Sequence, residues 1–159
     1  MPVGPIDADV EAPVGLVYQM LAAIGQGPAT GGERSQIVEA DGDRTVCDFW
    51  TLVPLPIGGS RLLRTREEVR LRPPDAVEFR HLDGALRDLH ERITVRALAD
   101  RRTRLTYAAL YRPATVLHRI GFWLARRVIE RTVAEHFASL RQRAEARASR
   151  SRVFSPEEA

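Results

Sequence analysis

Three side chains of this 159-residue chain belong to types that move protons or stabilise negative charge: His136, Glu68 and Arg66. An imidazole exchanges protons near pH 7, and a carboxylate can do so when burial raises its pKa. An arginine beside such a carboxylate would act as its charge partner. These residues indicate acid–base chemistry, and that chemistry requires two or more of them to converge inside one cavity.

The sequence contains no pattern for a resident metal. Cys47 is the single cysteine, so the chain can form neither an internal disulfide nor a Cys-x-x-Cys ligand pair. His118 and His136 would lie about 27 Å apart along one helix, which is too far to share an ion. We therefore expect no metal and no other cofactor.

The residues from about 114 to 148 have the periodicity of one long helix. At 100° per residue, one apolar stripe also contains His136. The stripe consists of Phe122, Ile129, Val133 and Leu140. A polar group in such a stripe is costly unless it faces a ligand or water, so His136 is the functional candidate. The alternative interpretation is a hydrogen-bonded histidine in the core or at its rim.

The same helix has a second apolar side, which predicts further cover by a loop or by a partner subunit. This side consists of Leu117, Ile120, Leu124 and Val128.

Strand-like segments occupy most of the chain before this helix. A first strand and a short helix, "GPIDADVEAPVGLVYQMLA", come first. The segments "SQIVEA" and "RTVCDFWTLV" then flank the turn "DGD", and further strands follow up to "RLTYAALY". Short turns predict one antiparallel sheet, and the long helix is able to cover its buried face. We predict an α+β domain over residues 1–148 and a loose tail over 149–159.

Several strand residues could line a cavity. Alternation puts Tyr107 and Tyr111 on one face with a small alanine between them, which suits a hollow face and ordinary packing equally. Residues 61–71 alternate between a mainly apolar face and a charged face that contains Glu68. Burial of the apolar face is the simpler interpretation, whereas burial of the charged face would bring Glu68 into the cavity. His81 could face inwards, and Trp50 would pack in the protein or stack on a flat ligand.

Composition excludes several classes of protein. The 24 basic residues are all arginine, yet the net charge is only +3, and the arginines are spread along the chain. A nucleic-acid-binding surface would require them to cluster. The first residues do not have the pattern of a signal peptide, and no apolar run reaches the roughly 18 residues of a membrane span. The expected location is the cytoplasm.

Three stretches resemble the START/Bet v 1-like (SRPBCC) superfamily, which includes polyketide cyclases and aromatases. They are "VEAPVGLVYQMLA", "VEFRHLDGALRDLHERITV" and "TRLTYAALYRP", and the resemblance extends from about Gly4 to Ala148. It implies the helix-grip fold. In that fold a curved antiparallel sheet of six to seven strands wraps around a long C-terminal helix, and two short helices follow the first strand.

The resemblance also implies a cofactor-independent cyclase or dehydratase of secondary metabolism, which folds a hydrophobic or aromatic substrate in an internal cavity. His136 falls where such cyclases place a polar pocket residue on the closing helix, and Glu68 falls near an inward arginine of theirs. We therefore take His136, Glu68 and Arg66 as catalytic candidates. The substrate-binding candidates are Tyr107, Tyr111, His81, Trp50, Phe122, Ile129 and Val133.

The alternative is a binding or transfer protein for a hydrophobic ligand such as a lipid or quinone. It needs the same cavity but no titratable pair. In either case the expected partner is a hydrophobic small molecule or polyketide intermediate, without nucleic acid or stable membrane insertion. The sequence is also compatible with a homodimer.

Overall fold

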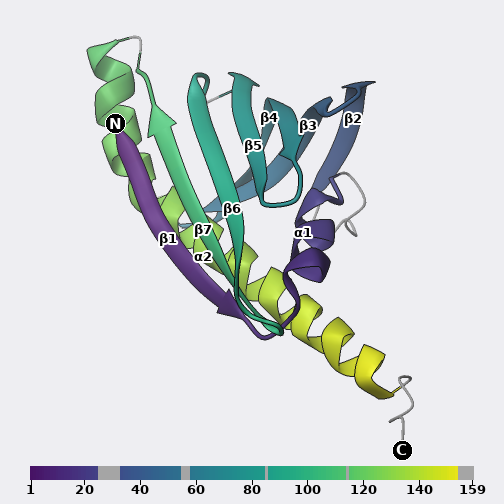
Figure 1. The fold of residues 1–159 in the computed structure, drawn as a ribbon. Coiled ribbons are helices and arrows are strands. Elements are labelled where there is room, and N and C mark those ends of the chain that lie inside the picture. The colour runs from purple at the N-terminus through teal and green to yellow at the C-terminus, as the bar shows by residue number, and fades with distance from the viewer. Residues whose placement is uncertain (25–32, 55–57, 85, 114, 154–159) are drawn as a thin grey trace, which may run out of the picture.

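The computed structural model describes residues 1–24, 33–54, 58–84, 86–113 and 115–153. They form one antiparallel sheet in the order β1-β7-β6-β5-β4-β3-β2 and two helices, α1 and α2 (Figure 1). The strands are β1 (Pro2–Val10), β2 (Arg34–Asp41), β3 (Arg44–Pro54), β4 (Ser60–Arg72), β5 (Ala76–Asp83), β6 (Leu89–Ala99) and β7 (Arg102–Tyr111). The helices are α1 (Val14–Ala22) and α2 (Val116–Val153).

Short turns account for the sequential pairing of β2 to β7. Gly42 and Asp43 connect β2 to β3, and Gly42 has a φ of 57°, which a two-residue hairpin turn requires. Asp100 and Arg101 form the equally short connection between β6 and β7. Strand β1 then pairs with β7, so the first and last strands of the chain lie side by side.

A bulge in β1 lies against the backbone of Tyr107. The register of the β1–β7 pair shifts between Val3 and Ile6, and Gly4 between them has a φ of 84°. A Cβ atom at this position would lie 2.7 Å from the carbonyl oxygen of Tyr107. Only glycine therefore permits this close approach of β1 to β7.

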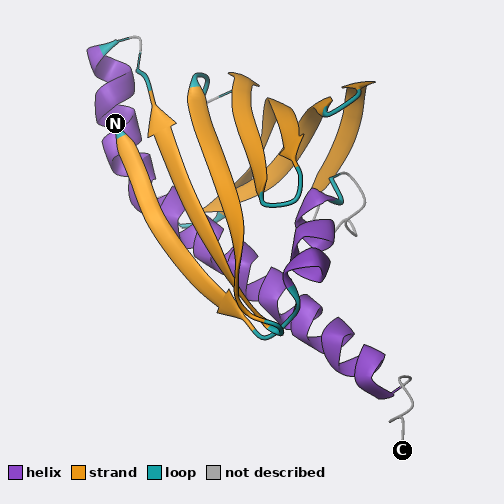
Figure 2. Cartoon of the chain, in the orientation of Figure 1, coloured by secondary structure: helices purple, strands orange, loops and turns teal. Residues whose placement is uncertain are grey.

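Helix α2 crosses one face of the sheet, which we call the inner face (Figure 2). Its buried side chains pack in one cluster with inward side chains of β7 such as Leu105 and Tyr107. The buried helix residues are Phe122, Phe137, Leu140, Ala144 and Ala148. Helix α1 adds Val17 to the same cluster, so both helices cover the inner face.

The opposite, outer face carries ion pairs rather than apolar cover. Asp9 of β1 accepts hydrogen bonds from Arg102 and Arg104 of β7. Across β3 and β4, Asp48 accepts hydrogen bonds from Arg64 and Arg66. Arginines on the outer face thus neutralise neighbouring carboxylates.

The helix-grip architecture predicted from the sequence is confirmed: a curved seven-stranded antiparallel sheet with a long C-terminal helix. Helix α2 continues to Val153, so the first residues of the predicted tail are helical and residues 154–159 lie outside the described part. One short helix follows β1. The second predicted one would involve residues 25–32, which are not described. Neither described helix is long and apolar enough to span a bilayer.

Candidate functional site

A row of titratable side chains crosses the inner face of the sheet. Glu67 lies on β4, His81 on β5 and Glu91 on β6. Glu67 and His81 are direct cross-strand partners, so their side chains project from the same face. The same face also carries Tyr107 of β7, which belongs to the cluster buried beneath α2.

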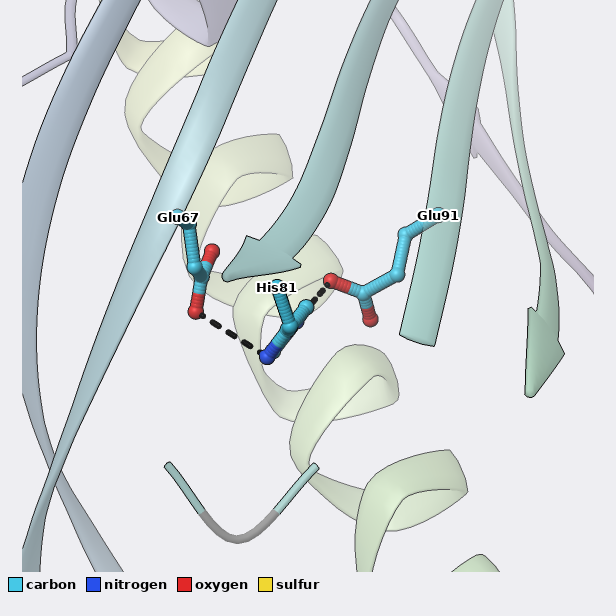
Figure 3. Close-up of side chains that lie close together, drawn as sticks. All are labelled: Glu67, His81 and Glu91. Atoms are coloured by element: carbon cyan, nitrogen blue, oxygen red, sulfur yellow. Dashed lines mark hydrogen bonds and ion pairs between the residues drawn. The ribbon is translucent and has the colours of Figure 1, made fainter. Parts of the chain in front are cut away.

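The imidazole of His81 lies between the two carboxylates (Figure 3). Its Nε2 atom is 2.9 Å from Oε2 of Glu91, and its Nδ1 atom is 3.6 Å from Oε1 of Glu67. Nδ1 is buried and has no hydrogen-bond partner among the described residues. A small inward movement of Glu67 would complete the second hydrogen bond.

Two hydroxyl groups hold the carboxylates in place. The hydroxyl of Tyr107 donates a hydrogen bond of 2.5 Å to Oε1 of Glu91. The hydroxyl of Thr65 donates one of 2.6 Å to Oε1 of Glu67. Each carboxylate therefore accepts a hydrogen bond from one hydroxyl group and also has an oxygen near the imidazole. Such an arrangement allows protons to pass between the carboxylates and the imidazole.

Burial makes this group electrostatically unusual. Glu67 is 8% exposed and His81 6% exposed, and Glu91 is half-buried. Burial raises the pKa of Glu67, and the nearby charge of Glu91 adds to this effect, although His81 and Thr65 oppose it. The carboxyl group of Glu67 therefore accepts a proton at a higher pH than an exposed glutamate.

The pKa of His81 is also raised. Burial alone would lower it, but the hydrogen bond to Glu91 and the negative charges of Glu67 and Glu91 outweigh that effect. Burial, followed by the charge of Glu91, raises the pKa of Tyr107, so its hydroxyl remains a donor. The site thus contains a proton-accepting carboxylate, an imidazole that readily holds a proton and a neutral phenol.

The same residues are also of the types that bind metal ions. Glu67, His81 and Glu91 each offer a ligand atom within 4.8 Å of the others. However, the two carboxylates face different nitrogens of the ring. An imidazolium, which donates from both nitrogens, fits this geometry better than a shared metal ion.

The choice of Glu68 and Arg66 as catalytic candidates depended on burial of the charged face of β4, and the structure buries the other face. Both side chains project from the outer face, because alternation along β4 turns Glu67 inwards. Glu68 accepts hydrogen bonds from Arg44 and Arg70, which lower its pKa. Arg66 pairs with Asp48 rather than with Glu68. The simpler interpretation of residues 61–71, with the mainly apolar face buried, is the one that the structure shows.

The predicted position of His136 is also wrong. His136 is exposed, whereas the adjacent Phe137 is 4% exposed. The buried side chains of α2 include Phe137 and Ala144 as well as the predicted stripe. Their mean direction lies about 70° around the helix axis from His136. The structure therefore does not bring His136 to the inner-face group. His118 is exposed as well.

Trp50 projects from the outer face, because it pairs across the strands with Arg34 and Arg64. The guanidinium of Arg34 lies 4.4 Å from the centre of its ring. The structure thus places Trp50 in a cation–π contact on the side of the sheet opposite His81.

The other substrate-binding candidates lie on the inner side. Tyr111 stacks on Phe122 with a distance of 4.4 Å between the ring centres, and both side chains are buried. Ile129 and Val133 are partly buried against the same cluster. Their role towards a substrate stays a prediction.

Sequence reasoning missed Glu67 and Glu91 as site residues. Alternation provided a signal for Glu67, because it shares a face with Thr65 and Val69. Glu91 shares a face of β6 with Leu89 and Ile93 in the same way. A carboxylate among apolar residues of one strand face is thus the pattern that marks this site.

An open hollow of about 640 Å³ lies on the outer face and is lined by charged residues such as Glu68, Arg70 and Glu78. These groups already pair with one another or with their neighbours. Glu68 binds Arg70, and Glu78 binds Arg72 and Arg92. The unusual protonation behaviour belongs to the inner group, so we place the candidate site there.

Comparison with known proteins supports the fold. No protein-family model matches the chain, and no curated protein matches it in sequence. Among solved structures, the Zhui aromatase/cyclase from Streptomyces sp. R1128 aligns with a TM-score of 0.76 and 18% identity over 92% of this chain and 94% of that one. A START superfamily protein from Mycobacterium smegmatis aligns with a TM-score of 0.66 and 13% identity over 94% and 99%.

The di-domain ARO/CYC StfQ from the steffimycin biosynthetic pathway aligns with a TM-score of 0.65 and 18% identity. The match covers 94% of this chain and 53% of that two-domain protein. The element order, the curved sheet around α2 and these similarities lead to one conclusion: this chain has the helix-grip fold that these aromatase/cyclase and START superfamily structures share.

Proposed function

We propose that the protein is a cofactor-independent cyclase or dehydratase of the polyketide cyclase/aromatase type. It would hold a hydrophobic or aromatic substrate between the inner face of the sheet and α2, and promote cyclisation with loss of water. Glu67, His81, Glu91 and Tyr107 would supply the acid–base groups.

One observation carries this proposal: a buried imidazole lies between two glutamates on the inner face. A protein that only binds an apolar ligand gains nothing from burying an imidazole and a carboxylate, because each costs free energy to desolvate. Burial raises the pKa of Glu67 in the direction of neutral pH, where an acid–base catalyst works best.

The proposed reaction is an aldol closure followed by dehydration. Glu67 as the base removes a proton from a methylene carbon between two carbonyl groups. The resulting carbanion forms a carbon–carbon bond with a second carbonyl carbon, and the oxygen of that carbonyl takes a proton from the His81 imidazolium. The proton on Glu67 then passes to the neutral His81, which restores both groups. The carboxylate removes a second proton from the same ring carbon, and the adjacent hydroxyl group leaves with a proton from the imidazolium, which releases water. A second transfer from Glu67 to His81 completes the cycle. These steps consume no oxidant or reductant.

The surrounding residues favour positioning of a flat, apolar substrate. Tyr111 and Phe122 provide stacked aromatic rings on the same side of the sheet, and Phe79 lies beside Glu91 on the neighbouring strand. Holding a flexible chain in one conformation can lower a barrier by several kcal/mol, up to roughly 7–11 in favourable cases. A few acid–base groups are then sufficient.

The test uses the purified full chain with a linear poly-β-ketone thioester. Product formation should fall by a factor of roughly 10² or more in His81→Gln, whereas the variant still binds the substrate. Fluorescence titration with an aromatic product analogue measures binding separately. Binding of the analogue without any product from the wild type would refute the enzyme proposal and favour a carrier of a hydrophobic ligand such as a lipid or quinone.

A further inference from the structure

The first turns of α2 expose an unusual set of large apolar side chains, which we call the apolar patch. The patch consists of Val116, Leu117, Ile120 and Trp123. Their exposed fractions are 70%, 75%, 55% and 70%. Large apolar side chains occur singly on most soluble surfaces, but a contiguous group that includes a tryptophan marks an interaction site.

The patch lies on the side of α2 that faces away from the protein core. At 100° per residue, the centre of the patch lies about 160° around the helix from the side that carries Phe122 and Ile129. Phe122 is 2% exposed and stacks on Tyr111, so the sheet already occupies that opposite side. The apolar patch therefore requires a partner other than the core described above.

The segment that contains the patch is positively charged. From residue 112 to 129 the chain contains four arginines and no acidic residue: Arg112, Arg119, Arg126 and Arg127. Arg126 pairs with Glu130, one turn further along the helix. Arg119 and Arg127 are both exposed, and neither forms an ion pair with another described residue. An apolar, tryptophan-containing surface with a basic border fits a partner that is apolar and negatively charged.

We propose that this end of α2 docks on the surface of an anionic phospholipid bilayer. Tryptophan favours the membrane–water interface, and helices that lie in the interface combine apolar side chains with arginine. Docking of this kind buries the side chains of the patch among the headgroups without any spanning segment. The neighbouring arginines add attraction to anionic headgroups.

A second copy of the chain fits the patch less well. Pairing two patches would bring the basic borders of both copies together, and the described acidic residues nearest in sequence already pair with Arg126 and Arg131. Like charges in an interface oppose association. A bilayer with anionic lipid supplies the opposite charge instead.

The test measures binding of the full chain to vesicles. Sedimentation with vesicles of phosphatidylcholine mixed with phosphatidylglycerol should exceed sedimentation with phosphatidylcholine alone, and added salt should weaken it. The chain has two tryptophans, so Trp50→Phe leaves Trp123 as the single tryptophan reporter. Its emission should shift to shorter wavelength when the anionic vesicles are added.

Three variants separate the contributions of apolar and basic side chains to vesicle binding. Leu117→Ser combined with Ile120→Ser should weaken binding roughly tenfold or more, because it removes two apolar groups and keeps Trp123. Arg119→Gln and Arg127→Gln should each weaken it about fivefold. Leu52→Ser combined with Leu62→Ser is the matched control. These residues are 41% and 39% exposed and pair on the outer face of the sheet, so vesicle binding should not change.

Three results would overturn the proposal. The first is equal sedimentation with neutral and anionic vesicles. The second is unchanged binding after loss of Leu117 and Ile120. The third is a dimer in light scattering that disappears in the Leu117→Ser/Ile120→Ser variant, because the patch would then bind a second copy. None of these results depends on turnover, so the membrane proposal can fail while the enzyme proposal stands.

Discussion

His81 of β5 and Glu91 of β6 are joined side chain to side chain, with Nε2 of His81 2.9 Å from Oε2 of Glu91. Glu91 in turn accepts a hydrogen bond from Tyr107 of β7. Three neighbouring strands therefore contribute to one chain of hydrogen bonds across the inner face. The orientation of the imidazole depends on strand pairing as much as on the residues themselves.

The adjacent residues Glu67 and Glu68 provide a matched pair of variants, because they project from opposite faces of β4. We expect Glu67→Gln to reduce turnover by a factor on the order of 10², since it removes the proposed base. Glu68→Gln should leave turnover within about twofold and cost about 1 kcal/mol of stability through weakened pairing with Arg44 and Arg70. Steady-state turnover and urea unfolding measure both effects. Equal loss of turnover in the two variants would contradict the assignment of the inner face.

Removal of one hydroxyl tests the role of Tyr107. Tyr107→Phe should lower the free energy of unfolding by about 1.5–3 kcal/mol, because Glu91 loses a buried donor. Tyr111→Phe is the control, since the ring that stacks on Phe122 is kept. Urea unfolding of both variants gives the comparison. An equal, small effect would mean that the Tyr107 hydroxyl does not support Glu91.

The raised pKa of His81 predicts a pH dependence of stability. The groups that face its ring are Glu67 on β4 and Glu91 on β6, and they favour the protonated form in the folded state. The resulting stabilisation is complete below the ordinary pKa of 6.5 and is lost as the pH rises through the higher folded value. Glu67 acts in the same direction, because its pKa is also raised when folded.

Unfolding of the wild type and of His81→Gln should therefore be compared across this range. The stability advantage of the wild type should shrink as the pH rises from about 6 to about 9. Glu67→Gln should reduce the slope without removing it, because Glu91 still contacts the ring. A difference between wild type and His81→Gln that stays constant over the range would show that the folded and unfolded pKa values of His81 are alike.

Variants of two adjacent residues, His136 and Phe137, test which side of α2 is buried. Phe137→Ala should cost about 3–5 kcal/mol, because the side chain is 4% exposed within the core cluster. His136→Ala should change stability by less than about 0.5 kcal/mol, because His136 is exposed. Its turnover should match the wild type. Thermal melts measure the stability of both variants, and turnover per folded molecule measures their activity. A large loss of activity in His136→Ala would make that residue a catalytic candidate again.

The sequence by itself determined the elements and their order. Alternation of apolar and polar residues marked the strands, the Asp-Gly-Asp turn joined β2 to β3, and helical spacing marked α2. Alternation also placed Tyr107 and Tyr111 on one face, and the structure has both on the inner side. These signals are local, since each depends on residues a few positions apart.

Tertiary structure decided which groups converge. Glu67, His81 and Glu91 lie on three different strands, and only the register of β4, β5 and β6 brings them within reach of one another. One step along β4 separates the buried Glu67 from the ion-paired Glu68, and the covering helix decides which of them is inside. The position of His136 depended likewise on the rotation of α2 against the sheet. Such choices arise because a strand or helix has two sides, and only the packing partner determines which one is buried.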